Sequence, residues 1–217
     1  KKFMILKSFF SRMKLNRVIL IAFVPIFFFF FILRFCKIFF NLPFTILIRD
    51  NPFFNFGSPL EGILSNIGIF LWFVSFAINF ILLVKLKNYI FIKPKFRLIT
   101  SLTLGAIFSI LLFFSDLFDL HNRYEEVVYL ILIISSILLF YFISKIHFYR
   151  NIKSIFFLSC VFLALSMTTD FIQYRFNFDN IGDHGIEHYV SLLEELFKFI
   201  GIFYFTFFWM ETFKKFY

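Results

Sequence analysis

The sequence is poor in charged residues, in cysteine and in residues that interrupt helices. Only 16% of its 217 residues are charged, and it has 2 Cys, 5 Pro and 7 Gly. So little charge excludes an ordinary soluble globular protein, whose surface needs polar cover. Cys36 and Cys160 are too few for a disulfide framework and say little about the redox compartment. The sequence also lacks a Walker loop, a dinucleotide-binding fingerprint, a CxxC pair and an internal repeat.

The chain has instead a large excess of apolar residues. Hydrophobic residues make up 61% of it, 43 residues are phenylalanine, and the mean hydropathy is +0.88. A soluble fold could not bury this much apolar surface, so the lipid bilayer must serve as solvent for much of the chain. The composition therefore predicts a polytopic integral membrane protein with the lipid bilayer as its main partner.

Long apolar segments predict how the chain crosses the bilayer. A helix needs about 20 apolar residues to span the hydrocarbon, and it satisfies its own backbone hydrogen bonds there. Six segments meet this requirement, with short loops between them: residues 17–39, 61–84, 98–120, 125–146, 154–174 and 189–213. The predicted fold is therefore all-α, a bundle of six transmembrane helices with short loops, forming a single domain over residues 1–217.

The basic residues predict the orientation of the bundle. Lys and Arg resist translocation and accumulate in short cytoplasmic segments. Most of them precede the first predicted span or follow the second, fourth and sixth: Lys1, Lys2, Lys7, Arg12, Lys14, Arg17, Lys85, Lys87, Lys93, Lys95, Arg97, Lys145, Arg150, Lys153, Lys214 and Lys215. We therefore expect both termini in the cytoplasm and the chain in a bacterial inner membrane or an organelle equivalent. The net charge of +9 then reflects orientation and not a nucleic-acid partner.

Ionisable residues also gather near the opposite, outer ends of the predicted spans. A charged side chain inside the bilayer costs a few kcal/mol by insertion scales, so such residues usually face the interior of a bundle and meet partners. The residues are Asp116, Asp119, His121, Glu125, Glu126, Asp170, His184, Glu187, His188, Glu194, Glu195 and Lys198.

Helical spacing places several of these residues on common faces. On the sixth span, alternating steps of four and three residues connect His184, His188, Ser191, Glu195 and Lys198. The third and fifth spans carry similar polar faces, formed by Asp116 with Asp119 and by Ser159, Ser166, Asp170 and Gln173. Because lipid contact is the alternative, we expect the three faces to meet around a water-accessible cavity that opens outward.

Lys198 lies nearest the middle of the membrane among these residues and needs an anionic partner there. The candidates are Glu194 or Glu195 on its own helix and Asp116 or Asp170 across the bundle. These five residues are the candidate catalytic groups. They are equally consistent with a structural ion-pair network that locks the third, fifth and sixth spans together.

The histidines suggest a metal site. His184 and His188 have HxxxH spacing, which projects both imidazoles from one side of a helix, and Asp119 and His121 are the further candidate ligands. A divalent metal such as zinc would lower the pKa of a bound water and prepare it for hydrolysis. Two solvated loop histidines are the alternative interpretation, since Gly182 and Gly185 lie where this helix is predicted to start.

With such a metal, the neighbouring charged residues have defined roles. Glu194 or Glu195 would act as general base, and Lys198 would stabilise developing negative charge. The run from Glu194 to Lys198 resembles the EExxK motif of PrsW-type intramembrane proteases, and HxxxH with upstream Ser and Asp is similar to the alkaline ceramidase superfamily. Both resemblances cover a handful of residues and imply a hydrolase. We therefore favour a metal-dependent hydrolase that acts on a lipid or a membrane-embedded peptide.

Other classes of function remain open. In an ion- or proton-coupled transporter, Asp116, Asp170, Glu195 and Lys198 would exchange charge as the cavity alternates its access, and a homo-oligomer would compensate for the small size and the missing repeat. A non-catalytic subunit or sensor would instead bind a membrane-complex partner or a cation through its outer acidic loops. A retinal-binding lysine is disfavoured by the six spans and by having only 2 Trp.

Overall fold

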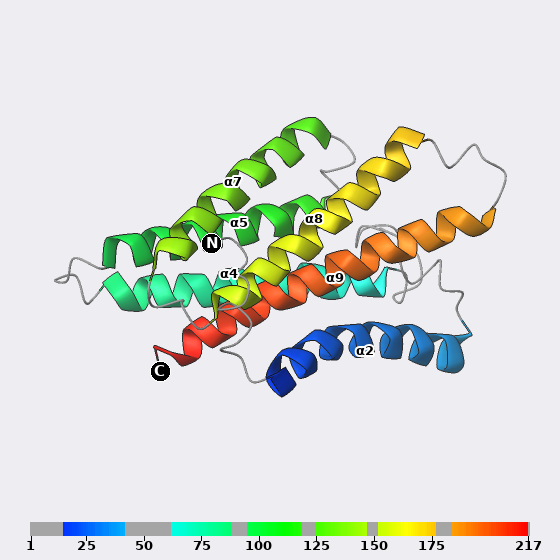
Figure 1. Cartoon of the computed structure of the whole chain (residues 1–217), viewed down its shortest axis with the longest axis horizontal. Helices are drawn as coiled ribbons and strands as arrows, with labels where there is room; N and C mark the ends of the chain where they lie inside the picture. The colour runs from blue at the N-terminus through cyan, green and yellow to red at the C-terminus, as the bar shows by residue number, and fades with distance from the viewer. Residues whose placement is uncertain are drawn as a thin grey trace.

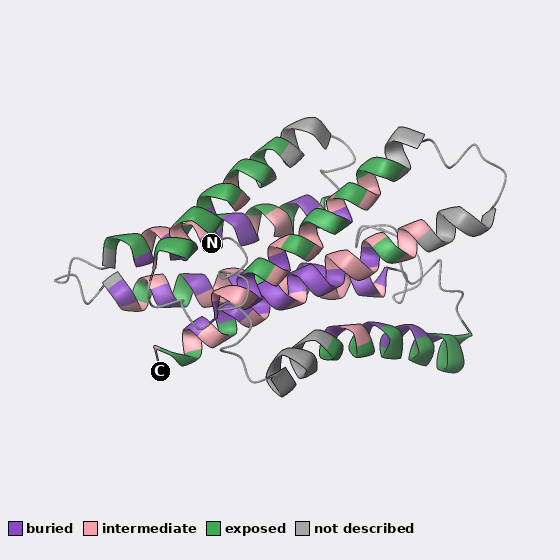
Figure 2. Ribbon diagram, viewed as in Figure 1, coloured by how far each residue is buried: buried purple, intermediate pink, exposed green. Residues whose placement is uncertain are grey.

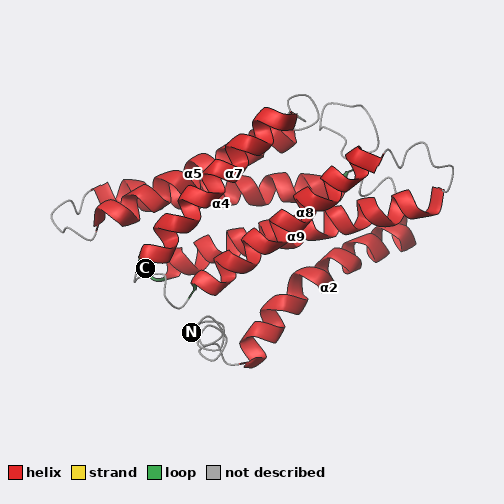
Figure 3. Ribbon diagram, turned by 45° about the horizontal axis from the view of Figure 1, so that its top comes forward, coloured by secondary structure: helices red, strands yellow, loops and turns green. Residues whose placement is uncertain are grey.

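A computed structural model of the chain describes residues 15–41, 62–87, 95–118, 125–146, 152–176 and 184–216, apart from some side chains near helix ends. Within these ranges every element is a helix and no strand is present, as Figure 3 shows. The helices are α2 (Leu15–Phe40), α4 (Ile63–Lys87), α5 (Lys95–Leu117), α7 (Glu125–Lys145), α8 (Lys153–Phe176) and α9 (His184–Lys214). Each coincides with one predicted span.

The predicted all-α membrane fold is confirmed. By length and composition, α2, α4, α5 and α8 are long and apolar enough to cross a membrane, and α7 contributes the shorter apolar stretch Ile133–Lys145. The exact number of spans stays a prediction. The largest difference from the predicted spans is at α9, whose helix begins before residue 189, at His184; the end of α4 and both ends of α5 differ by smaller shifts.

The core of the bundle lies around α9, which contacts α8, α4 and α2, while α5 packs between α4 and α7 (Figure 1). The middle of α9 is the most continuously buried part of the molecule in Figure 2. Its Phe205 and Trp209 are fully buried, and the Phe205 ring meets Trp72 of α4 edge-on at 5.2 Å between ring centroids. Aromatic packing therefore fixes the position of α9 relative to its neighbours.

The contact between α8 and α9 depends on a residue without a side chain. A Cβ atom on Gly201 of α9 would lie 2.7 Å from Cγ of Leu163 and 3.0 Å from its backbone nitrogen. At the same place the Ser159 hydroxyl of α8 donates a hydrogen bond of 2.8 Å to the Gly201 carbonyl. Small residues let membrane helices approach closely in this way, because lipid supplies no hydrophobic drive between helices.

Helix α2 lies at the edge of the bundle. One face packs on the rest of the protein through a small cluster in which Phe29 and Leu33 meet Leu64 and Phe199. The opposite face exposes large apolar side chains such as Phe27, which is the surface expected of a helix in lipid.

Successive helices run in alternating directions. The beginnings of α2, α5 and α8 and the ends of α4, α7 and α9 therefore lie at the same end of the bundle, at the left in Figure 1. These are the helix ends that carry the basic residues Lys87, Lys95, Lys145, Lys153 and Lys214.

Candidate functional site

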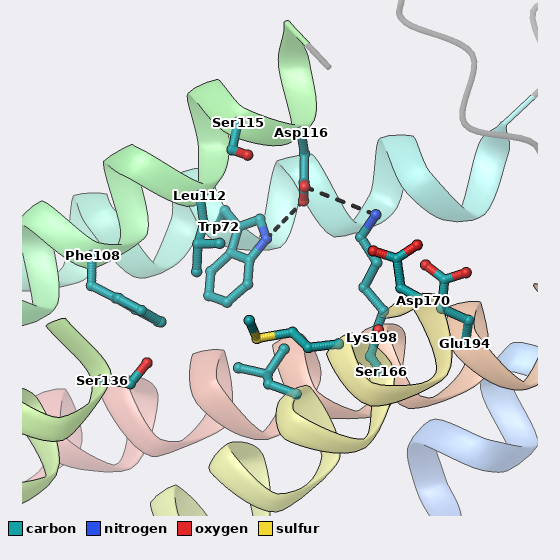
Figure 4. A pocket seen from close by; sticks show the side chains of 12 residues that line it. Trp72, Phe108, Leu112, Ser115, Asp116, Ser136, Ser166, Asp170, Glu194 and Lys198 are labelled. Carbon is teal, nitrogen blue, oxygen red and sulfur yellow. Dashed lines mark hydrogen bonds and ion pairs between the residues drawn. The ribbon is translucent and has the colours of Figure 1, made fainter. Parts of the chain in front are cut away.

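An ion cluster lies between α5 and α9 (Figure 4). The Lys198 ammonium nitrogen is 3.9 Å from Oδ1 of Asp116 on α5 and 3.7 Å from Oε1 of Glu195, one helical turn earlier on α9. The other carboxylate oxygen of Asp116 accepts a hydrogen bond of 3.0 Å from the indole N–H of Trp72 on α4. Three helices thus contribute to one polar group.

The three charged side chains are almost removed from solvent. Only 16% of the Lys198 side chain is exposed, against 9% for Asp116 and 7% for Glu195. A charge at such a place is costly unless opposite charges and hydrogen bonds compensate it. Lys198 compensates both carboxylates, and the Trp72 indole additionally orients Asp116. The two carboxylates therefore depend on Lys198, because its loss would leave both without this cation.

The ion cluster forms one wall of a cavity of about 100 Å³. Five helices, α4, α5, α7, α8 and α9, contribute its lining: Trp72, Phe108, Leu112, Ser115, Asp116, Ser136, Leu163, Ser166, Met167, Asp170, Glu194 and Lys198. In Figure 4 the carboxylates of Asp170 and Glu194 lie on the same side of the cavity as the Lys198 side chain. A largely apolar cavity with a polar wall of carboxylates, an ammonium and hydroxyls, which we call the polar chamber, therefore lies within the bundle.

This set of groups has a defined chemical capacity. Carboxylates can accept or return a proton, an ammonium can stabilise a developing negative charge, and Ser115, Ser136 and Ser166 offer neutral hydrogen bonds. Low dielectric surroundings strengthen each of these interactions. The chamber can thus hold a small polar group and exchange protons with it.

The structure brings together the residues proposed as catalytic. Of the four candidate partners of Lys198, Asp116 and Glu195 lie within 4.0 Å of its nitrogen, and Asp170 and Glu194 line the same cavity. Their catalytic roles remain predictions. The polar faces of the third, fifth and sixth predicted spans correspond to α5, α8 and α9, and all three reach the cavity.

Sequence reasoning missed the contributions of α4 and α7. Trp72 and Ser136 line the cavity, although neither belongs to a charged motif. For Trp72 a signal was present, because an indole N–H in the middle of an apolar span needs an acceptor, and the acceptor must come from another helix. Ser136 offers no such signal, since serine is common in membrane helices.

The structure describes only the backbone of two predicted metal ligands, His184 and His188. His184 and His188 fall on the first turns of α9, where the backbone is helical, so the motif begins the helix and does not precede it. Their side chains, like Asp119 and His121, lie outside the described part of the chain. Among the side chains that are described, no group of three or more His, Cys, Asp or Glu lies close enough to hold a metal ion.

Fold and site together define a helical membrane protein with a polar cavity inside its bundle. The chain belongs to the family described as Domain of unknown function (DUF8692), which matches residues 18–211. It matches no curated protein and no solved structure. The family description names no activity, so the function must be derived from the site.

Proposed function

We propose that this protein is a membrane-embedded hydrolase that acts on a lipid or a membrane-embedded peptide. One observation carries the proposal: the Lys198 ammonium, held 3.9 Å from Asp116 and 3.7 Å from Glu195, lines a chamber that Glu194 and Asp170 also line. Hydrolysis needs a proton acceptor for water and a positive group for the developing oxyanion, and this wall supplies both.

The proposed reaction assigns a role to each group. Glu194 takes a proton from water, and the hydroxide adds to the electrophilic carbon of the scissile bond. Lys198 stabilises the negative charge that develops on the attached oxygen, while Asp116, oriented by Trp72, holds Lys198 in position. When the bond breaks, the leaving group receives the proton from Glu194, so that one water is consumed for each bond cleaved.

A divalent metal such as zinc is part of the proposal. His184 and His188, with Asp119 or His121, are the ligands expected from the sequence, and a metal there would lower the pKa of a bound water. Metal analysis of the purified protein tests this part against a variant carrying His184→Ala and His188→Ala. We expect stoichiometric metal in the parent and its loss in the variant. A parent without stoichiometric metal would reject the metal-dependent form of the reaction.

The proposed orientation places both termini in the cytoplasm and the chamber toward the opposite face. It is supported by the basic residues at the helix ends that include Lys87, Lys145 and Lys214. A protease-cleavable tag at the C-terminus, tested on right-side-out and inverted vesicles, should be cut in the inverted vesicles alone. Cleavage in right-side-out vesicles would reverse the orientation.

The central experiment measures hydrolysis in reconstituted vesicles. The parent protein is placed in vesicles of the host lipid extract, and cleaved lipids are measured by mass spectrometry, with a fluorogenic transmembrane peptide in parallel. The matched variant is Glu194→Gln, which removes the proposed base and preserves side-chain size. We expect products from one substrate class with the parent and a loss of about 100-fold or more with the variant. Equal amounts of cleaved lipid and cleaved peptide with the two proteins would reject the proposed hydrolase.

Coupled transport is the second candidate, and one observation favours it. Lys198 has carboxylates from two helices at nearly equal distances, so a small displacement would change its partner. Proton flux into vesicles, followed with an internal pH dye, distinguishes the two functions. A transporter should lose flux when Lys198→Met, Asp116→Asn and Glu195→Gln are combined, and it should retain flux with Glu194→Gln. If this combined variant, hereafter the neutralised variant, retains every activity of the parent, the cluster is structural.

A further inference from the structure

A second cavity adjoins the polar chamber. Its volume is about 160 Å³, and its lining is almost entirely apolar: Phe108, Ile133, Ser136, Ile137, Leu139, Phe156, Cys160, Leu163, Ala164, Met167 and Phe205. The two cavities share Phe108, Ser136, Leu163 and Met167. The polar chamber and this second cavity, which we name the α7/α8 groove, are therefore neighbours that share a wall.

The α7/α8 groove faces the side of the bundle that meets lipid. Its rim on α7 contains Ile133, which is 48% exposed, and Ile137, which is 63% exposed. Its rim on α8 contains the exposed Ala164. Helix α7 packs mainly on α5 and touches α8 only sparsely. A hydrocarbon chain can therefore pass sideways from the bilayer into the groove.

We propose that the α7/α8 groove binds the hydrocarbon chain of a membrane lipid whose polar head occupies the chamber beside Asp116 and Lys198. This inference rests on the proposed function and deepens it, because it selects a lipid over a membrane-embedded peptide as the substrate.

The chemistry of the lining excludes a peptide. One turn of a peptide helix, about 10–12 Å across with its side chains and about 5.4 Å long, takes up more than twice the groove's volume of about 160 Å³. An unwound peptide would bring backbone N–H and C=O groups that need partners in lipid, and the groove offers little beyond the Ser136 hydroxyl. A hydrocarbon chain carries no such groups.

The charge of the chamber selects the head of the lipid. A chain that leaves lipid for an apolar groove gains little hydrophobic energy, so the head must supply most of the affinity. Among the described lining residues, Asp116, Asp170 and Glu194 carry carboxylates and Lys198 carries the single ammonium. An anionic head would lie beside three carboxylates, whereas a neutral or amine-bearing head can donate hydrogen bonds to them.

Three single-chain probes of equal length test the inference: dodecylamine, dodecanol and dodecanoate. Binding to the purified full chain in detergent is measured with forms that carry bromine on the chain close to the head group, because bromine quenches a tryptophan that it contacts and Trp72 lines the chamber that the head would occupy. We expect saturable quenching by the amine and the alcohol, and binding of the carboxylate weaker by about tenfold or more. Equal affinity for all three probes would reject the selection by charge.

Two matched variants test the groove itself. Ala164→Phe fills it, whereas Leu165→Phe adds the same side chain to an exposed neighbour on α8 that is not part of the lining. We expect Ala164→Phe to weaken the binding of dodecylamine by about tenfold or more, and Leu165→Phe to leave this binding unchanged. Equal binding by both variants would overturn the inference.

The binding experiment distinguishes a failure of the proposed lipid site from a failure of the proposed hydrolase activity. Binding requires no turnover, so saturable, groove-dependent binding without any hydrolysis would reject the enzyme and support the lipid site. Hydrolysis of the transmembrane peptide, with dodecylamine unable to compete, would instead reject the lipid site and leave the enzyme.

Discussion

Replacing Lys198 by methionine should destabilise the folded protein strongly. The substitution keeps much of the side-chain volume but removes the charge that lies between Asp116 and Glu195. Two carboxylates are then left in a site where their side chains are only 9% and 7% exposed. The cost arises from these uncompensated charges, more than from the lost attraction.

The geometry sets the size of the effect. Opposite unit charges about 4 Å apart attract by about 4 kcal/mol at an effective dielectric constant of about 20. Breaking a buried pair on one side costs about 3–5 kcal/mol. Both distances to Lys198 exceed those of a charge-assisted hydrogen bond, so we expect the lower end of this range, about 3 kcal/mol, in the free energy of unfolding.

The assay is reversible unfolding in mixed micelles, with an exposed pair as control. Lys214 and Glu211 are closer, at 2.8 Å, but their side chains are 62% and 29% exposed. Solvent screens such a pair, and Lys214→Met should change the free energy of unfolding by about 0.5 kcal/mol or less. The neutralised variant should regain most of the stability that Lys198→Met loses, because the two carboxylates that Lys198 compensated are neutralised with it.

Two results would refute this reasoning. Equal losses from Lys198→Met and Lys214→Met would mean that burial does not govern the cluster. A neutralised variant as unstable as Lys198→Met would mean that the lost contacts, and not the uncompensated charges, cause the instability.

Further substitutions test other parts of the structure. Trp72→Phe removes the indole donor to Asp116 and should lower the free energy of unfolding by about 1–3 kcal/mol. Because the two residues interact, the effects of Trp72→Phe and Asp116→Asn on the free energy of unfolding should not add in the double variant. Gly201→Ala should lower the thermal midpoint, because the new methyl group meets Leu163 backbone and side-chain atoms and overpacking costs about 1–3 kcal/mol. Gly68→Ala is its control: the nearest atom is the end of a flexible isoleucine side chain at 3.2 Å, so the helix propensity gained, about 1 kcal/mol, should leave the midpoint unchanged or raised.

The helices could be predicted because their cause is local. An apolar run of sufficient length must satisfy its backbone inside the bilayer, and every predicted span coincides with a helix for this reason. The ends were less well predicted. The apolar span of α9 was placed from residue 189, whereas its helix was expected to start near Gly185 and begins at His184, since helical hydrogen bonds persist beyond the hydrocarbon.

The sequence limited the candidate partners of Lys198 to four carboxylates, but it could not identify the two that lie within 4.0 Å of its nitrogen. Spacing along one helix places Glu195 on the same face as Lys198, so that half of the cluster is already present in the sequence. Asp116 belongs to another helix, and its approach depends on the depth and rotation of α5 relative to α9. Trp72 holds the other oxygen of Asp116 from a third helix, and no spacing rule connects it with either residue.

The sequence by itself determined that the protein is a helical membrane protein and which residues share a helix face. Composition and periodicity are properties of single segments, so they can be read without the tertiary structure. Only the tertiary structure decided which helices are neighbours. That choice depends on shape, as where Gly201 admits Leu163 and where α7 packs on α5 and leaves a groove beside α8. Side-chain packing between segments far apart in the chain has no period that a sequence displays.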